Sequence, residues 1–130
     1  MPAAIGVSLA RDHAPVLCMV GDGSAMYSPQ ALWSAVHEEV PVIFVVLNNL
    51  EYGILKNFTL SQPQYNAKEH GFLAMDICQP KVDFQSLARS MGVESTFVDS
   101  HRKISEAIEA ALNTGKPHLI EIAVTGVAGK

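Results

Sequence analysis

Apolar runs alternate with helical patterns along this chain. Residues 16–20 and 42–47 form two continuous apolar runs, which we expect to be strands covered on both faces. Shorter apolar stretches at 95–98 and 119–124 are expected to be strands as well. Strands that alternate with helices are typical of an α/β fold in which helices flank a parallel sheet. We therefore predict one domain of this class over residues 1–130.

Helical periodicity fills most of the segments between these strands. Asp83 is expected to cap a helix that ends at Gly92, and Ser100 to begin another that ends at Gly115. The segment 61–82 has no such period, which in a compact domain favours a functional or mobile loop. The other expected helices span residues 3–10, 29–39 and 52–60, the second with Ser28 as its cap and Pro29 at its first position.

Charge and composition argue against several classes of function. The net charge is −4 and the nine basic residues are scattered, so we expect no nucleic-acid-binding surface. The longest apolar run, residues 40–47, has eight residues, whereas a membrane span needs about 20. Cys18 and Cys78 have no paired or CxxC spacing, and no basic segment precedes an apolar one at the N-terminus. These observations favour a reducing, cytoplasmic setting.

Polar residues follow both continuous strands at the point where each ends. Asp22 lies in Gly21-Asp22-Gly23 after the first strand, and Asn49 lies in Asn48-Asn49 after the second. A strand, a crossover helix and a second strand bring the carboxyl ends of parallel strands side by side. Open α/β folds bind ligands at that edge of the sheet, and a carboxylate with an amide oxygen suits Mg²⁺ and a diphosphate. Taken singly, such residues are more often turns or caps.

The residues around this aspartate are candidates for contacting the diphosphate. Gly23, Ser24 and Ala25 are expected to precede a helix, so their N–H groups can point at a phosphate with a favourable helix dipole. A glycine at position 23 permits close approach of a ligand, and Ser24 offers a hydroxyl donor. The alternative role of Ser24 is that of a helix cap. Gly21 completes this side of the candidate site.

The combination of Gly21-Asp22-Gly23-Ser24-Ala25, a spacer and Asn48-Asn49 resembles the diphosphate-binding motif of thiamine diphosphate (ThDP) enzymes. The chain is most similar to the benzoylformate decarboxylase and acetolactate synthase group, which acts on 2-oxo acids. The similarity covers nearly the whole chain except residues 61–81. Further matching segments are residues 2–6, 28–33, 48–53 and 117–122.

The resemblance implies specific roles for the residues that follow the second strand. Mg²⁺ would bind the Asp22 carboxylate, the Asn49 side chain and the backbone carbonyl of Glu51, with the diphosphate and a water completing its coordination. Tyr52 and Gly53 would contact the same diphosphate, although Tyr52 is almost as often simply a half-buried aromatic residue. Many relatives have a small or polar residue at position 51. The Glu51 carboxylate could therefore strengthen metal binding or repel the diphosphate.

The helix that follows would contribute to a substrate pocket. In the resembling decarboxylases, positions that match Ile54, Leu55 and Phe58 line the pocket for an aryl or alkyl group. The alternative, that these three residues form part of the core, is at least as common for such side chains.

The resemblance also implies that the chain is incomplete by itself. In these enzymes residues 2–6 lie within a helix that follows a further strand and a loop touching the pyrimidine ring, and a glutamate of a separate domain activates the cofactor. We therefore expect a diphosphate-binding domain truncated at its N-terminus and inactive alone, which needs a pyrimidine-binding domain or subunit supplied by another chain. The alternatives are a small subunit of a split ThDP enzyme and a non-catalytic binding remnant. An uncovered apolar surface would make the isolated chain a homo-oligomer.

Overall fold

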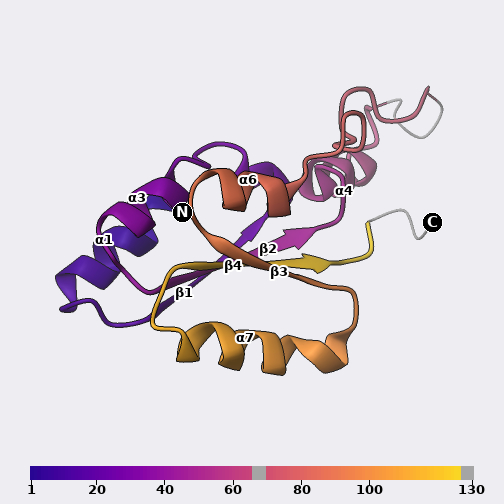
Figure 1. Cartoon of the computed structure of the whole chain (residues 1–130). Helices are drawn as coiled ribbons and strands as arrows, with labels where there is room; N and C mark the ends of the chain where they lie inside the picture. Colours follow the sequence, from indigo (N-terminus) through magenta and orange to yellow (C-terminus); the bar gives the residue numbers. More distant parts are fainter. Residues whose placement is uncertain (66–69, 127–130) are drawn as a thin grey trace.

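The computed structural model of the chain describes residues 1–65 and 70–126, and its centre is a four-stranded sheet. The strands lie in the order β1-β2-β4-β3, and all three neighbouring pairs are parallel (Figure 1). The predicted α/β fold with a parallel, helix-flanked sheet is confirmed. The strands are β1 (Val16–Gly21), β2 (Val42–Asn48), β3 (Glu94–Val98) and β4 (His118–Ala123).

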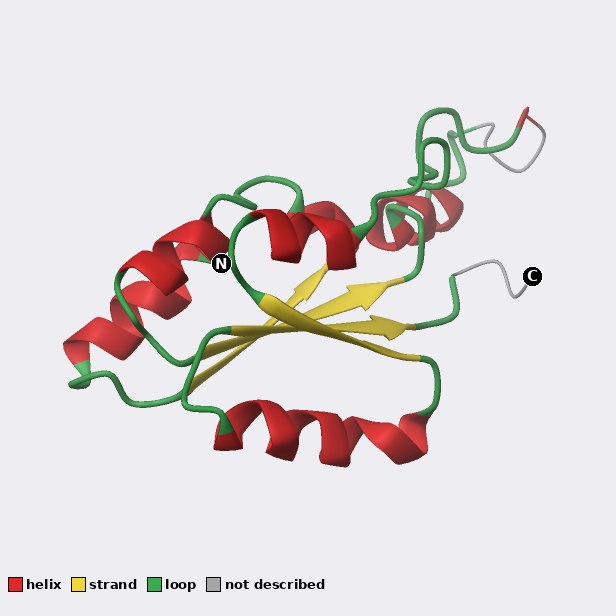
Figure 2. Ribbon diagram, viewed as in Figure 1, coloured by secondary structure: helices red, strands yellow, loops and turns green. Residues whose placement is uncertain are grey.

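Helices cover the two faces of the sheet unequally. Three helices, α1, α3 and α6, lie over one face, and α7 lies on the opposite face (Figure 2). α4 lies beyond the carboxyl ends of the strands and projects from the rest of the molecule. The described helices are α1 (Pro2–Ala10), α2 (Asp22–Ala25), α3 (Ala31–His37), α4 (Gly53–Ser61), α6 (Phe84–Ser90) and α7 (Ile104–Asn113), and a 3₁₀ turn, η1 (His101–Lys103), precedes α7.

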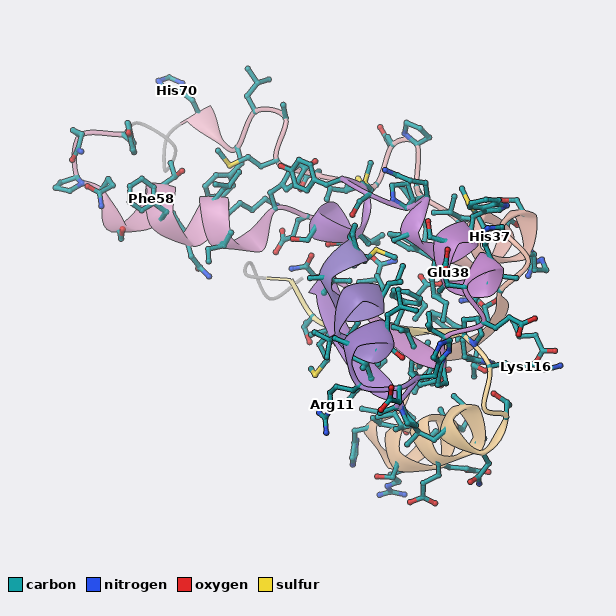
Figure 3. All side chains as sticks on the ribbon, turned by 90° about the vertical axis from the view of Figure 1, so that its left-hand side faces the viewer. Arg11, His37, Glu38, Phe58, His70 and Lys116 are labelled. Carbon is teal, nitrogen blue, oxygen red and sulfur yellow. The ribbon has the colours of Figure 1, made fainter. Side chains whose placement is uncertain are left out.

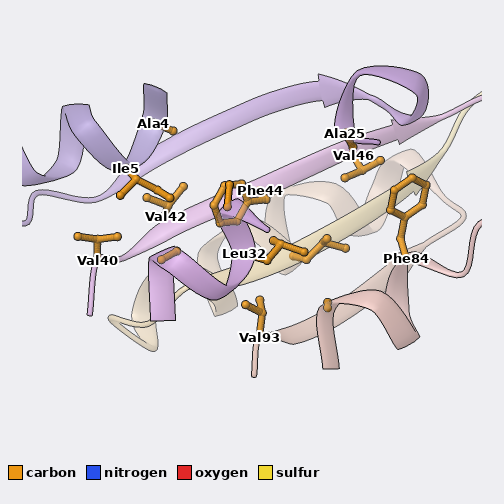
Figure 4. Packing of buried hydrophobic residues seen from close by; sticks show 14 residues of the cluster. Ala4, Ile5, Ala25, Leu32, Val40, Val42, Phe44, Val46, Phe84 and Val93 are labelled. Atoms are coloured by element: carbon orange, nitrogen blue, oxygen red, sulfur yellow. The ribbon is translucent and has the colours of Figure 1, made fainter. Parts of the chain in front are cut away.

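The two sides of β2 fill two separate hydrophobic clusters. Val42, Phe44 and Val46 belong to the larger cluster, under α1, α3 and α6 (Figure 4). Ile43 and Val45 belong to the smaller cluster, which packs against α7. Successive strand residues point to opposite faces, so a continuous apolar run is what a doubly covered strand requires. Each fully buried side chain of this size contributes about 1.5–3 kcal/mol to stability.

β1 is not covered in the same way, and the prediction that both of its faces are buried is wrong. Leu17 is 45% exposed and Met19 is 62% exposed, while the alternate residues Val16, Cys18 and Val20 are half-buried. β1 is an edge strand, and α7 packs mainly against β2, β3 and β4. An apolar stripe on β1 therefore faces solvent.

Helix boundaries differ from the predictions by a few residues at several places. The helix predicted to begin at Ser100 begins at Ile104, because residues 101–103 first form the 3₁₀ turn η1. The helix predicted to begin at Pro29 begins at Ala31, and Ser28 does not cap it, because residues 28–32 first form a tight turn with i to i+3 hydrogen bonds. Residues Asp22–Ala25 form the one-turn helix α2 themselves, so Gly23, Ser24 and Ala25 lie within a helix instead of preceding one.

The predicted cap of α6 is confirmed. The Asp83 carboxylate accepts a hydrogen bond from the Ser86 N–H at 2.9 Å, which satisfies one of the free donors at the helix start. Gly92 follows the helix with a φ of 77°, a conformation that glycine adopts without steric cost. The end of α6 is therefore determined locally.

The segment predicted to lack regular structure is attached to the loop after β2. Glu51 and Asp76 form an antiparallel bridge, and Cys78 pairs in the same way with Lys81. Residues 66–69 of this segment lie outside the described residues. None of the helices in the described ranges is long and apolar enough to cross a membrane.

Candidate diphosphate and metal site

The carboxyl ends of β1 and β2 meet, as the spacing of Asp22 and Asn49 predicts. Gly21 at the end of β1 is in register with Leu47 of β2, so Asp22 follows at the level where β2 ends. The N–H of Leu50 donates a hydrogen bond to Asp22 Oδ2 at 2.8 Å, which joins the two strand ends directly. An acidic oxygen from one strand therefore lies beside the loop that carries Asn49.

The carboxylate of Asp22 is buried, with only 4% of the residue exposed. Its Oδ1 accepts a hydrogen bond from the Gly23 N–H at 2.8 Å. Burial raises the pKa of Asp22, and the N–H groups of Gly23 and Leu50 oppose that rise only in part. Within residues 1–65 and 70–126, no basic side chain forms an ion pair with it. A cation at this position would compensate a buried charge that the described residues do not neutralise.

Leu50 has a left-handed backbone conformation, with a φ of 61°. Side chains other than glycine adopt this region rarely, and such strain collects at functional loops. The Leu50 N–H is shared between Asp22 Oδ2 and Asn48 Oδ1, the latter at 3.1 Å. Two acceptors thus hold the strained residue in place. The next turn is closed by Asn49, whose Oδ1 accepts the Glu51 N–H at 3.1 Å.

A buried carboxylate that the sequence did not single out supports this loop from β4. Glu121 accepts a hydrogen bond from Asn48 Nδ2 at 2.7 Å and another from Gln85 Nε2 at 3.0 Å. A chain of hydrogen bonds therefore runs from α6 through Glu121, Asn48 and the Leu50 N–H to Asp22. Only the position of Glu121 between Ile120 and Ile122 of a buried strand marked it as unusual.

The ring of Tyr52 packs directly on the backbone of Gly23. A Cβ atom added to Gly23 would lie 2.6 Å from the Tyr52 ring. The contact with Tyr52 therefore favours glycine at this position, whatever ligand approaches. Gly53 is buried at the start of α4, the side chain of Ala25 is buried in the larger cluster, and Ser24 is exposed.

The side chain of Glu51 is buried and forms an ion pair with Lys56. Lys56 also binds Asp76 Oδ1 at 2.6 Å. The hydrogen bonds that Lys56 donates to Asp76 and Glu51 raise the pKa of Lys56 above its usual value. These residues, together with Asn49 and Thr125, border a cleft of about 380 Å³ beside the loop. Neither Lys56 nor Asp76 was predicted, because their pairing depends on a segment with no regular period.

The three residues predicted to line a substrate pocket lie on the projecting helix α4. Leu55 and Phe58 border a cavity of about 430 Å³ together with Met75, whereas Ile54 is 82% exposed and does not border it. Phe58 lies on the arm that extends away from the sheet (Figure 3). None of the three belongs to either core cluster, so the alternative that they form the core is not supported.

The donor set at the meeting strand ends fits Mg²⁺. In the described part of the chain, no group of three or more His, Cys, Asp or Glu side chains is arranged so that it could hold a metal ion. The candidate ligands are instead one carboxylate, one amide and one backbone carbonyl, from Asp22, Asn49 and Glu51. Mg²⁺ prefers hard oxygen ligands and usually combines few protein groups with phosphates and waters. The buried carboxylate of Asp22 supplies the charge that such a site needs.

Comparisons with known proteins agree with this arrangement. A family model described as "Thiamine pyrophosphate enzyme, C-terminal TPP binding domain" matches residues 1–122. Benzoylformate decarboxylase of Pseudomonas aeruginosa is 36% identical over 94% of this chain and 22% of its own length. Acetolactate synthase large subunit of Parasynechococcus marenigrum is 29% identical over 95% of this chain and 19% of its own length.

A solved structure shows the same fold at similar identity. The thiamine diphosphate-dependent 4-hydroxybenzoylformate decarboxylase of Rhodococcus jostii RHA1 superposes with a TM-score of 0.84 and 35% identity, over 97% of this chain and 23% of that one. The resemblance to ThDP enzymes is therefore confirmed. The chain spans about a fifth to a quarter of the length of these three proteins.

Proposed function

The chain belongs to the C-terminal TPP-binding domain family of thiamine pyrophosphate enzymes, and on this basis we propose that it binds the diphosphate of ThDP together with Mg²⁺. The observation that carries the proposal is the hydrogen bond from the Leu50 N–H to the buried Asp22 carboxylate, because it joins the two halves of the motif. The enzyme type that fits best is a 2-oxo acid decarboxylase similar to benzoylformate decarboxylase.

The proposed ligands of Mg²⁺ are the Asp22 carboxylate, the Asn49 side chain and the Glu51 carbonyl. Asp22 would supply the charge, and the hydrogen bonds already described would orient the other two groups. Asn49 now closes the turn at Glu51, and its Oδ1 has a second lone pair available for a metal. The proposed contacts of the diphosphate are Gly21, Gly23, Ser24, Ala25, Tyr52 and Gly53.

Bound ThDP supplies an electron sink for cleavage of the bond next to the carbonyl group of a 2-oxo acid. The role we propose for this chain is to bind and orient the diphosphate end. Leu55 and Phe58, with Ile54 nearby, would border the substrate. The pyrimidine-binding domain and its activating glutamate would come from another domain or chain, and we expect no decarboxylation by these 130 residues alone. A cytoplasmic setting stays a prediction.

Two other functions remain as hypotheses with distinct signatures. A small subunit of a split ThDP enzyme would also bind ThDP with Mg²⁺, and adding a polypeptide with the pyrimidine-binding domain would restore activity. A non-catalytic remnant would bind neither. Calorimetric titration of the chain with ThDP, with and without Mg²⁺, separates the remnant from the two ThDP-binding functions.

The proposal is tested by Asp22→Asn, which removes the charge at nearly constant size. The new amide oxygen can accept the Gly23 N–H, and the Leu50 N–H keeps Asn48 as acceptor. The new NH2 group faces the Leu50 N–H, so we expect a cost in stability of about 1–3 kcal/mol, and folding is checked by circular dichroism before the titration. Interactions with charged groups contribute about 1.5–3 kcal/mol, and about 1.4 kcal/mol is a factor of ten. We therefore expect the Mg²⁺-dependent affinity for ThDP to fall roughly tenfold to a hundredfold.

The matched control is Asp99→Asn, because Asp99 is an exposed aspartate in a surface ion pair with Lys103. The affinity of this variant for ThDP with Mg²⁺ should equal that of the wild type. Equal affinities for the wild type and Asp22→Asn would reject the metal site, as would ThDP binding that a chelator leaves unchanged.

A further inference from the structure

A lysine, and not an apolar face, attaches α4 to the rest of the domain. Gly53 and Lys56 are the buried residues of this helix, and glycine has no side chain to pack. The side chain of Lys56 is only 7% exposed. Lysine is almost never buried this completely without paired charges, so its position needs an explanation. The large apolar residues of α4 are exposed, namely Ile54, Leu55, Phe58 and Leu60.

Lys56 joins two segments that are distant in sequence. Its Nζ binds the carboxylate of Glu51, in the loop after β2, and Oδ1 of Asp76, 20 residues further along the chain. The same two segments are paired through their backbones, with the Tyr52 N–H donating to the Met75 carbonyl at 2.8 Å. On the other side of Glu51, the Ile77 N–H donates to the Leu50 carbonyl at 2.7 Å.

Glu51 is therefore held on every side before any ligand arrives. Its N–H is bound by Asn49 Oδ1, its neighbours are bound by the segment around Asp76, and its side chain is bound by Lys56. A backbone carbonyl cannot turn when the atoms on both sides of it and its own side chain are fixed. Its buried carboxylate is also directed toward a cation, which offsets its charge near the proposed diphosphate.

We propose that Lys56 is a positioning residue, which fixes the orientation of the Glu51 carbonyl for Mg²⁺ by binding Glu51 to Asp76. This inference rests on the proposed function, in which that carbonyl is a metal ligand. It also answers why an acidic side chain is tolerated beside a diphosphate: the ion pair with Lys56 occupies the carboxylate.

The first test needs no cofactor. Lys56→Met keeps most of the length of the side chain and removes its charge. Lys103→Met is the matched control, because Lys103 forms an exposed pair with Asp99 at 3.8 Å. Amide hydrogen exchange of the metal-free protein should be at least tenfold faster at Tyr52 and Ile77 in Lys56→Met. The amides of β2 should keep their wild-type exchange rates in both variants. Lys56→Arg, which keeps the charge, should restore most of the protection.

The second test measures metal selectivity in the presence of ThDP. Mg²⁺ requires short bonds of about 2.0–2.1 Å in near-octahedral geometry, whereas Ca²⁺ accepts bonds of about 2.3–2.6 Å and flexible geometry. When the Glu51 carbonyl is no longer fixed, the affinity for Mg²⁺ should fall at least tenfold and the affinity for Ca²⁺ much less. The ratio of the two affinities should therefore fall. A purely structural loss of folded protein would lower the binding of both metals equally.

A double variant separates positioning from charge. Glu51→Gln keeps the carbonyl and removes the carboxylate, so the pair Lys56→Met and Glu51→Gln has no excess negative charge near the diphosphate. Weak Mg²⁺ binding by the double variant supports positioning, and full recovery of Mg²⁺ binding overturns it. If Lys56→Met does not fold, Asp76→Asn replaces it, because Asp76 is largely exposed and the buried pair of Lys56 with Glu51 remains.

The outcomes distinguish this inference from the proposed function. Wild-type exchange rates and a wild-type Mg²⁺/Ca²⁺ ratio in Lys56→Met overturn the positioning role while ThDP binding stands. A wild-type chain that binds no ThDP with Mg²⁺ rejects the proposed function, and the metal-positioning role falls with it even if exchange at Tyr52 is faster.

Discussion

Replacing Gly23 by alanine tests the contact that places Tyr52 beside the motif. The added Cβ would lie 2.6 Å from Cε1 and 3.0 Å from Cδ1 of Tyr52, and 3.3 Å from Cδ1 of Ile77. Carbon atoms attract one another best at about 3.5–4.0 Å, so the ring must move by roughly 1 Å. Tyr52 is half-buried, which allows this movement at a limited cost. The change therefore strains a contact without preventing folding.

The expected magnitude is the balance of two opposing effects. Forcing an extra methyl group into a packed site destabilises a protein by about 1–3 kcal/mol. Alanine in place of glycine in a helix, here α2, contributes about 1 kcal/mol in the opposite direction. The net loss should be about 1 kcal/mol, which lowers Tm by about 4 °C in a domain of this size.

The assay is equilibrium unfolding in urea of the metal-free protein, followed by far-ultraviolet circular dichroism, in two backgrounds. In the wild type, Gly23→Ala should be destabilising. In a Tyr52→Ala background the ring is absent, and the same change should be neutral or stabilising by up to about 1 kcal/mol. Gly21→Ala is the control, since no atom lies within 4 Å of its added Cβ. A loss of equal size in both Tyr52 backgrounds would refute the packing of Tyr52 on Gly23.

Three further predictions address the sheet and its edges. Burial lowers the pKa of His118 below the ordinary histidine value. The free energy of unfolding should therefore be highest above about pH 6.5 and should decrease as the pH falls through the lower pKa of the folded state. Between about pH 8 and 5, the urea midpoint of His118→Gln should change less than that of the wild type. Glu121→Gln should lower the free energy of unfolding in urea by about 1–3 kcal/mol, because the new NH2 group faces the amide donor of either Asn48 or Gln85. Light scattering should show self-association of the wild type at tens of micromolar, and Leu17→Lys with Met19→Lys should give a monomer near 14.0 kDa; a wild-type monomer would contradict this.

The parts of the fold that follow from local pattern were predictable. The run in β2 is apolar at every position because both faces are covered, and its bounds were predicted to within one residue. The run in β1 is equally apolar, yet one of its faces is exposed. An apolar pattern reports that a residue suits burial, and it cannot report whether another element packs on that face. The error at Leu17 and Met19 has this origin.

The candidate site was predictable as far as it depends on strand ends. Asp22 and Asn49 follow two parallel neighbours, and the topology brings them together. The supporting residues depend on contacts between distant segments and had no local signal. Lys56 looks like a solvent-facing residue of an amphipathic helix, and its burial goes together with its pairing with Glu51 and Asp76. The supporting role of Glu121 similarly depends on its hydrogen bond with Asn48 of the neighbouring strand.

The way α4 is attached separates the stability of the domain from the substrate contacts proposed for this helix. Its outward residues Ile54 and Phe58 belong to neither hydrophobic cluster, and a short ionic contact at Lys56 secures the helix. If α4 borders a substrate, as proposed, substitutions at these outward positions should change that contact and should alter the folding free energy little. Most destabilising mutations arise in packed cores, so a helix outside the core is a permissive place for variation. A lineage built on this scaffold can explore new specificities without first accumulating stabilising mutations.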